Sequence, residues 1–310
     1  MADAHPRLRE LVERARAQAR HGVPRLALVH PCDALALQAA TTIDAEGIGQ
    51  PLLVGSRDEL ARAADAAGVD LQRFEVVPTD GGAAGAARRA VALARDGAVA
   101  ALMKGSLHTD ELMGAVVSRD DGLRTERRIS HAFVFDLPRY PKLLALADCV
   151  VNIAPDLRTK LDIVGNAVGF LQRLGVERPK VGVVAAVESV NPQIPATVDA
   201  RALVEHAVQG RWPGAVVEGP FGFDNVISAD AARVKGLSSQ VAGDADLLVM
   251  PDLNAGNMLY KSFVYIGGGD CAGLVLGARV PVVLTSRADS QQARVASAAL
   301  ALLTSGPSVG

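Results

Sequence analysis

Short apolar runs alternate with helix-length segments along the first hundred residues, and this alternation restricts the fold more than any other feature. The apolar runs are 25–30, 51–55, 74–78 and 98–103, and the helix-length segments between them are 33–46, 57–67 and 83–95. Gly47, Gly68 and Gly97 follow these segments, where glycine supplies a left-handed helix cap. Strands alternating with helices of this length predict βαβ units and a parallel sheet, and therefore an α/β fold.

The middle of the chain departs from this rhythm. Two extended candidates, 128–135 and 143–153, are separated by a short link that contains Pro138 and Pro141. A short link of this kind favours an antiparallel ribbon. A long helix over 156–174 follows, with its apolar residues on one face. The α/β rhythm then resumes and ends in a helix predicted over 288–303.

The length of 310 residues suggests about two domains. We expect a first α/β domain from residues 1–145 together with 286–310, and a second from residues 146–285. The final helix would then pack back on the first domain. A small-molecule site is expected in the cleft between two such domains.

Charge and cysteine content exclude several functional classes. The formal net charge of −2 leaves no global basic surface, so no nucleic-acid partner is expected. The cysteines, Cys32, Cys149 and Cys271, are far apart, which argues against a disulfide framework or a common zinc pattern. We expect each to be a small buried residue in a reducing compartment, and we expect no metal.

The N-terminal segment indicates a soluble protein. Residues 7–20 interleave charged and apolar residues, which predicts an amphipathic surface helix. A membrane-surface helix is the alternative, although Glu10 and Glu13 interrupt its basic face. The sequence contains no signal peptide and no apolar run of membrane-spanning length. We therefore expect a cytoplasmic location and no membrane partner.

Two segments after apolar runs carry candidate anion-binding residues. Residues 251–257, PDLNAGN, follow the run 247–250 and offer Asn254, Gly256 and Asn257, with Lys261 farther along the helix. A strand end that enters a helix is a typical anion site. The alternative is a turn with an Asn N-cap.

Residues 103–109, MKGSLHT, have the same strand-to-helix context. Lys104, Gly105 and Ser106 suit a phosphate or phosphoryl oxygen, and His108 lies beside them. The alternative is a glycine-containing loop with a helix cap.

Two further segments combine hydroxyl, guanidinium and carboxylate groups. Ser286, Arg287 and Asp289 follow the run 282–284 and could orient a thiol, neutralise a phosphate and accept a proton. A capping box is the alternative for this segment. In the segment 124–131, Arg128 and Ser130 are candidates, since arginine makes bidentate phosphate contacts. The alternative is that these arginines are simply solvated.

Taken together, the segments resemble the phosphate acetyltransferase and phosphate butyryltransferase family. The landmarks are MKGSLHTDELM, RRISHAFVFD, ADCVVNIAPD, EGPFGFDNVIS, VAGDADLLVMPDLNAGNMLYK and PVVLTSRADS, which run in family order over roughly residues 95–305. The short length and the SRADS form look closer to the butyryltransferase branch. One departure is Val264-Tyr265, where acetyltransferases carry an arginine.

The resemblance implies a two-domain fold like that of isocitrate and isopropylmalate dehydrogenases, usually a homodimer, with the active site in the interdomain cleft. It implies the reversible reaction acyl-CoA plus phosphate giving acyl phosphate plus CoA, with a short acyl group and no cofactor beyond these substrates. By motif position, Ser286 would hold the thiol, Arg287 would bind phosphate or the carbonyl oxygen, and Asp289 would be the base. Lys261 and Arg128 would share the CoA and phosphate contacts. An acyl kinase is a possible functional partner.

Three alternatives remain open from the residues. A metal- and NAD-dependent dehydrogenase would share the implied fold, with Asp244, Asp246 and Asp252 as candidate metal ligands. An acyltransferase that uses acyl carrier protein would need a basic docking face. A non-catalytic acyl-CoA-binding protein would bind CoA without turnover. The sequence leaves the acyl chain length undecided.

Overall fold

The chain forms two compact units in the computed structural model, which describes residues 5–286 and 289–306. Residues 6–127, 272–286 and 289–306 make up the discontinuous unit, and residues 128–271 with His5 make up the inserted unit. The sequence placed these divisions later, at 145/146 and 285/286. They fall earlier because the strand at 130–136 pairs with the strand at 144–147, and the strand at 282–283 pairs with the one at 101–104.

The discontinuous unit contains a sheet with the strand order β3-β2-β1-β4-β11-β10. Its pairs are parallel except β10–β11. From β1 the chain moves outward to β2 and β3, then returns to place β4 on the other side of β1. The strands are β1 (Arg25–Val29), β2 (Gln50–Gly55), β3 (Glu75–Pro78), β4 (Ala101–Lys104), β10 (Asp270–Leu276) and β11 (Val282–Val283).

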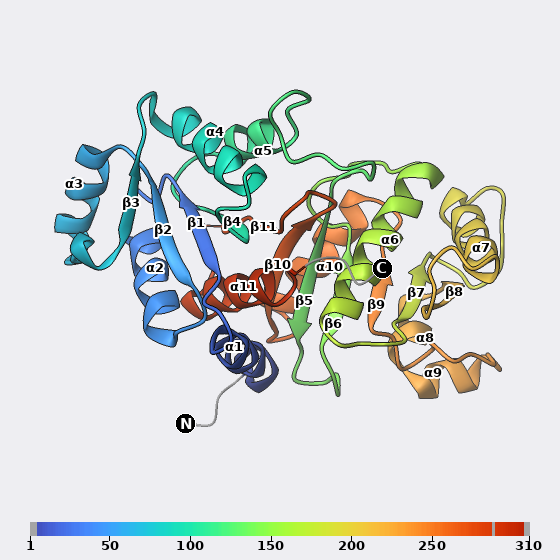
Figure 1. Cartoon of the computed structure of the whole chain (residues 1–310). Helices are drawn as coiled ribbons and strands as arrows, with labels where there is room; N and C mark the ends of the chain where they lie inside the picture. The colour runs from blue at the N-terminus through green and yellow to red at the C-terminus, as the bar shows by residue number, and fades with distance from the viewer. Residues whose placement is uncertain (1–4, 287–288, 307–310) are drawn as a thin grey trace. The chain divides into compact units, whose positions relative to one another are not determined.

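Helices cover both faces of this sheet. Figure 1 shows α4 and α5 on one side of the strands and α1, α2 and α11 on the other. The helical elements are α1 (Pro6–Ala19), α2 (Ala34–Glu46), α3 (Arg57–Ala67), the 3₁₀ turn η1 (Leu71–Arg73), α4 (Gly82–Arg95), α5 (Thr109–Val116) and α11 (Gln291–Leu303).

The predicted glycine caps and the packing of the last helix are confirmed. Gly47 and Gly68 both have φ of 65°, and Gly97 has φ of 74°. Helix α11 packs against α1 and α2, so the end of the chain returns to its beginning. The apolar face of α1 is buried, including Leu8 and Leu11. This burial accounts for the amphipathic pattern without a membrane surface.

The inserted unit has the strand order β5-β6-β9-β7-β8. The pair β5–β6 is antiparallel, which confirms the predicted ribbon, and the other pairs are parallel. The elements are β5 (Ser130–Asp136), β6 (Leu144–Ala147), α6 (Leu157–Arg173), β7 (Lys180–Val184), α7 (Pro195–Val208), β8 (Val216–Phe221), α8 (Phe223–Ile227), α9 (Ala229–Val234), β9 (Leu247–Val249) and α10 (Leu253–Tyr265).

Strand β6 is shorter than the predicted 143–153. The carboxylate of Asp148 accepts hydrogen bonds from the N–H groups of Val150 and Val151, at 2.9 and 3.0 Å. These bonds turn the chain away from the strand, because a side-chain acceptor competes with the ladder for the same N–H groups.

The cysteines divide into two environments. Cys149 and Cys271 are buried in the core of the inserted unit, as expected. The expectation of a buried residue is wrong for Cys32, which is only half-buried because it lies in the loop after β1 rather than in a core strand.

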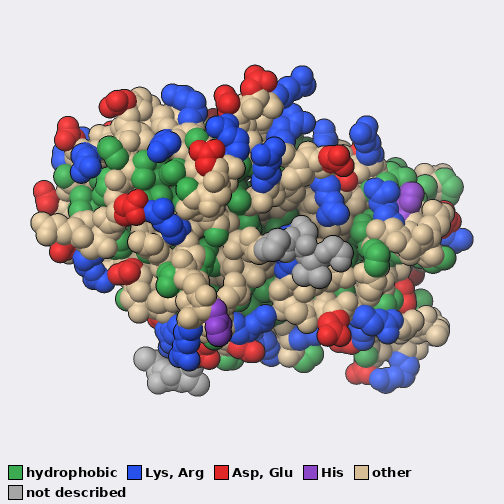
Figure 2. Space-filling model, viewed as in Figure 1, with side chains coloured by type: hydrophobic (Ala, Val, Ile, Leu, Met, Phe, Trp, Pro, Cys, Tyr) green, Lys and Arg blue, Asp and Glu red, His purple; other side chains and the backbone are tan. Residues whose placement is uncertain are grey.

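Figure 2 shows basic and acidic side chains intermixed over the viewed face. Across the portions of the chain with assigned structure, no helix is both long and apolar enough to cross a bilayer.

Candidate active site

The strand order of the discontinuous unit creates a switch point between β1 and β4. Their carboxyl ends lie side by side, with Val29 opposite Lys104. In open parallel sheets, ligands bind outside the carboxyl ends of the strands at such a point. A cavity of about 240 Å³ occurs here, lined by Asp33, Leu35, Lys104, Gly105, Ser106, Leu107, His108, Thr109, Thr285, Ser286 and Arg294.

The loop between β4 and α5 brings four predicted site residues, Lys104, Gly105, Ser106 and His108, to this cavity. The Gly105 N–H donates to the Val29 carbonyl at 2.9 Å. A Cβ on Gly105 would lie 2.6 Å from that carbonyl oxygen, so the close approach requires glycine. His108 is the N-cap of α5, and its N–H donates to the Glu111 carboxylate at 2.8 Å. The structure therefore also contains the alternative considered from the sequence, a glycine-containing loop followed by a helix cap.

The Ser106 hydroxyl connects the loop after β4 to the loop after β1. It donates to the His30 carbonyl at 2.8 Å and accepts from the Cys32 N–H at 3.1 Å. The Ser106 N–H donates to the same carbonyl at 2.9 Å. Ser106 thus positions the cavity wall.

Thr285 and Ser286 form a further part of the cavity lining. The Thr285 hydroxyl donates to the Lys104 carbonyl at 3.0 Å, which holds this segment beside β4. The Ser286 N–H donates to Asp289 Oδ2 at 2.6 Å. The helix itself begins at Gln291 with Ser290 as its N-cap, rather than at the predicted 288, so the Ser286–Asp289 pair closes a turn before the helix. Arg287 lies outside the described residues.

Arg294 is a cavity residue that the sequence reasoning missed. Its side chain is buried, with the residue 4% exposed, and its guanidinium donates to the Ser286 carbonyl. Its Nε has no hydrogen-bond partner within the described part of the chain. A buried cation with an unfilled donor suits an anionic ligand, since such a group is otherwise costly to bury. The available signal was a lone charge in QQARVASAALALL, an otherwise uncharged helix of small apolar and polar residues.

Helix α10 in the inserted unit carries the PDLNAGN residues. The helix begins at Leu253 with Asp252 as its N-cap, so the cap is aspartate rather than the asparagine considered from the sequence. A Cβ on Gly256 would lie 2.6 Å from the Asp148 carbonyl oxygen. Asn257 Nδ2 donates to the Cys149 carbonyl at 3.2 Å. These two residues hold α10 against the segment after β6.

The remaining predicted residues of the inserted unit differ in accessibility. Asn254, Lys261 and Arg128 are exposed. Arg128 Nη1 donates to the Thr159 hydroxyl at 3.3 Å, so this arginine is fixed against α6 rather than only solvated. Ser130 is 1% exposed and accepts from Asn166 Nδ2 at 3.0 Å. Its burial argues for a structural role rather than direct contact with a substrate.

The carboxylates considered for a dehydrogenase metal site are already engaged. Lys142 Nζ lies 2.8 Å from Asp244 Oδ1 and 2.6 Å from Asp246 Oδ1, and Lys180 also pairs with Asp244. Hydrogen bonds from both lysines lower the pKa of Asp244. Asp252 accepts the Ala255 N–H at 3.0 Å as a helix cap. This arrangement is an ion-pair cluster and a cap rather than a set of carboxylates around an ion.

The fold and the cavity define a class: an α/β protein with a largely parallel sheet and, at its switch point, a cavity lined in part by Lys104 and Arg294. Residues 83–302 match the sequence profile of the family described as "Phosphate acetyl/butaryl transferase". The chain belongs to this family and is an acyltransferase, which confirms the predicted family.

Named relatives agree over most of their length. A phosphate acetyltransferase of Rhizobium meliloti is 48% identical over 292 residues, which are 94% of this chain and 92% of the relative. A phosphate butyryltransferase of Clostridium acetobutylicum is 38% identical over 270 residues, covering 87% and 89%.

Solved structures bear out the fold. A branched-chain phosphotransacylase from Enterococcus faecalis V583 superposes with a TM-score of 0.81 at 29% identity, covering 91% of this chain and 99% of that one. A 4-hydroxythreonine-4-phosphate dehydrogenase from Klebsiella pneumoniae gives a TM-score of 0.56 at 16% identity, with 92% and 99% covered. The second likeness concerns the fold alone and confirms the predicted dehydrogenase-like α/β architecture.

Proposed function

We propose that this chain catalyses the reversible reaction of a short acyl-CoA with inorganic phosphate to give acyl phosphate and CoA. The observation that carries the proposal is the cavity at the β1–β4 switch point, where Lys104 and the buried Arg294 supply positive charge. Phosphate is the small anion of the family reaction. CoA and acyl-CoA act as substrates, and the reaction needs no further cofactor.

The proposed chemistry is a direct acyl transfer. A phosphate oxygen attacks the thioester carbonyl, a tetrahedral intermediate forms, and the C–S bond breaks to release the CoA thiolate, which takes up a proton. In reverse, the thiol loses its proton to a base, and the thiolate attacks the acyl phosphate carbonyl. Cationic groups aimed at the developing oxyanion would supply the largest catalytic effect.

The residues take the following proposed roles. Lys104 and Arg294 hold phosphate, with Gly105, Ser106 and His108 shaping the loop around it. Ser286 holds the thiol, and Arg287 binds phosphate or the carbonyl oxygen. Lys261, Arg128, Asn254, Gly256 and Asn257 remain candidates for the CoA and phosphate contacts.

Asp289 is the proposed base, and its geometry permits a sharp test. One carboxylate oxygen accepts the Ser286 N–H at 2.6 Å, so the residue also braces the turn. Asn at this position keeps a carbonyl acceptor for the brace but cannot take a proton, whereas Ala removes both. If Asp289 is the base, Asp289→Asn and Asp289→Ala both lose about 100-fold or more in turnover. If Asp289→Asn keeps most of its turnover while Asp289→Ala is inactive, Asp289 only holds the turn through the Ser286 hydrogen bond and is not the base.

Acetyl-CoA is the proposed preferred acyl donor. The motif form indicates a butyryl-type preference, but identity is higher to the phosphate acetyltransferase, 48% against 38% for the butyryltransferase. We also propose that an acyl kinase consumes the acyl phosphate, and that the enzyme works in the cytoplasm.

A homodimer is the proposed assembly, supported by an exposed apolar patch on α10. The name α10 patch denotes the exposed apolar residues Met258 and Tyr265 on α10 and Ile266 directly after it, of which Tyr265 and Ile266 are 75% and 86% exposed. Apolar side chains gathered on one helix commonly mark an interface. The family arginine is replaced by Val264-Tyr265 at this place, which makes the surface more apolar.

The deciding experiment measures phosphate-dependent thiol release from acetyl-, propionyl- and butyryl-CoA without added metal. Wild type should release thiol fastest from acetyl-CoA, and Ser286→Ala should reduce the rate at least about tenfold because the thiol loses a positioning contact. Absence of phosphate-dependent release from every acyl-CoA, with CoA binding retained, would favour the binding-protein alternative. NADH formation from isocitrate-like acids with Mg²⁺ would favour the dehydrogenase.

A further inference from the structure

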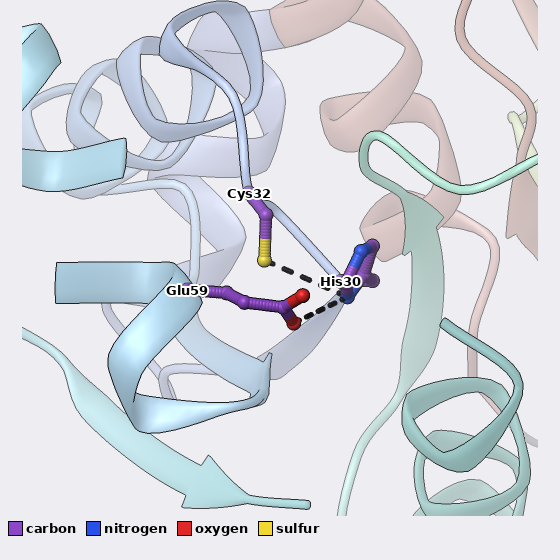
Figure 3. Close-up of side chains that lie close together, drawn as sticks. All are labelled: His30, Cys32 and Glu59. Carbon is purple, nitrogen blue, oxygen red and sulfur yellow. Dashed lines mark hydrogen bonds and ion pairs between the residues drawn. The ribbon is translucent and has the colours of Figure 1, made fainter. Parts of the chain in front are cut away.

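Three potential metal ligands meet in the loop after β1 and on α3. His30 Nδ1 lies 3.5 Å from Cys32 Sγ and 3.9 Å from Glu59 Oε2. All three ligand atoms are within 4.8 Å of one another. Figure 3 shows the three side chains pointing toward a common centre, with Glu59 reaching in from α3.

The spacing fits a tetrahedral metal. With metal–nitrogen and metal–sulfur bonds of about 2.05 and 2.3 Å, two ligand atoms at a tetrahedral angle lie roughly 3.5 Å apart. The His30–Cys32 separation is 3.5 Å. For nitrogen and carboxylate oxygen the same reasoning gives roughly 3.3 Å, so Glu59 must approach by roughly half an ångström. The Glu59 side chain is 38% exposed and long, which allows this movement.

The surrounding structure holds these ligands in place before any metal arrives. His30 has a positive φ of 51°, which is uncommon for a residue other than glycine. Its carbonyl accepts three hydrogen bonds, from the Cys32 N–H, the Ser106 N–H and the Ser106 hydroxyl, at 2.9, 2.9 and 2.8 Å. Strained backbone that is fixed on several sides is typical of functional positions.

Glu59 supplies an independent observation. Its Oε2 atom is buried, yet it accepts no hydrogen bond from the residues whose positions the structure gives. A buried carboxylate oxygen without a donor is costly, and a cation at the centre of the cluster would satisfy it. One thiolate and one carboxylate would balance the two charges of a divalent ion.

We propose that His30 Nδ1, Cys32 Sγ and the Glu59 carboxylate bind one divalent cation of the zinc class, with water in a fourth position. Nitrogen, sulfur and oxygen ligands together select zinc over magnesium or calcium, which prefer oxygen alone. The Cys32 thiol releases one proton to solvent on binding. The site takes no part in the proposed acyl transfer, and it adjoins the cavity through the Cys32–Ser106 hydrogen bond.

The first test uses Co²⁺ and Zn²⁺ titration of the full-length protein after chelator treatment. We expect one ion per chain and a sulfur-to-cobalt charge-transfer band. Cys32→Ser should abolish the band, and Glu59→Gln should weaken binding by more than the roughly 10–100-fold that loss of an outer-shell partner costs. Asp58→Asn, the exposed neighbour on α3, is the matched control and should bind as wild type does.

The second test is independent of any variant. X-ray absorption at the zinc edge of the wild-type protein should show one sulfur with nitrogen or oxygen ligands. A spectrum without sulfur, absence of stoichiometric binding by wild type, or a charge-transfer band that persists in folded Cys32→Ser would each overturn the proposal.

Discussion

Arg294 is a buried cationic side chain in the lining of the cavity. A guanidinium inside a helix that packs on a sheet loses its hydration, and its Ser286 contact replaces only part of it. The unfilled Nε therefore makes the empty cavity less stable than the cavity with an anion in it. A bound phosphate would accept a hydrogen bond from Arg294 Nε, so phosphate binding should raise the stability of the folded protein.

Replacing Arg294 should affect phosphate more than CoA. One lost charge-assisted hydrogen bond is worth about 1.5–3 kcal/mol, which corresponds to a roughly 10- to 100-fold loss. We expect Arg294→Met to lower kcat/KM for phosphate by at least this factor, and Arg294→Lys to restore only part of it because lysine lacks the planar fork. Arg89→Gln on α4 is the exposed control. Equal losses for phosphate and CoA would contradict a phosphate contact.

His131 makes stability depend on pH. Burial lowers its pKa from 6.5 to about 4, against the opposing pull of Asp148. The unfolded chain then binds more protons between these values, so stability is fully present above about pH 6.5 and is lost as pH falls toward 4. The slope is at most about 1.4 kcal/mol per pH unit for one proton.

Urea unfolding at several pH values measures this dependence. His131→Gln should flatten the slope between pH 6.5 and 4, whereas the exposed His21→Gln should leave it unchanged. An unaltered slope in His131→Gln would assign the acid sensitivity to carboxylates instead.

At the scale of elements, the cavity depends on how tightly the loop after β4 lies against the loop after β1. The Cβ of an alanine at Gly105 would meet the backbone of Val29, His30 and Pro31 within 2.7 Å. We expect Gly105→Ala to cost about 1–3 kcal/mol in unfolding free energy and to abolish activity, because the backbone must shift.

Gly114 is the matched control, since a Cβ there meets nothing within 4 Å inside α5. Gly114→Ala should stabilise the protein by about 0.5–1 kcal/mol, because alanine loses less chain entropy in a helix. Thermal unfolding together with thiol release distinguishes the two. Full activity in Gly105→Ala would mean that the two loops need not approach closely.

Helices and strands with a clear periodic pattern of apolar residues were predictable from the sequence. Short helices and the exact first residue of a helix were not. The helix over 57–67 and the antiparallel ribbon follow from spacing and glycine caps. The short helices α8 and α9 were missed because one or two turns carry little periodicity. The last helix begins at Gln291 because Ser290 caps it, whereas only the capping box at Ser286 and Asp289 was considered from the sequence.

The candidate site was only partly predictable for a related reason. Lys104, Ser106 and Ser286 stand at strand ends, where sequence reasoning looks for ligand contacts, and they line one cavity. Arg294 sits inside a helix, and only packing shows that it points to that cavity. His30 and Glu59 meet through tertiary structure, which no short spacing encodes.

At the scale of the whole molecule, the proposed dimer is directly testable. Burying the α10 patch between two chains removes apolar surface from water, which favours association. Sedimentation should give twice the chain mass for wild type and a lower mass for Tyr265→Ser combined with Ile266→Ser. Val208→Ser, an isolated exposed apolar residue on α7, is the control and should not change the mass. A wild-type monomer would contradict the proposal.

The order in which the chain is made has a consequence for its biosynthesis. The discontinuous unit needs β11 beside β4, and β11 and α11 come from the last forty residues. Residues 128–271 of the inserted unit are therefore made before β11, while the earlier strands β1–β4 wait with the β4 edge unpaired. Exposed strand edges invite association with other chains. Newly made chains should thus be most vulnerable to aggregation late in translation, and a nascent chain truncated before Val282 would lack both Ser286 and the strand that completes its sheet.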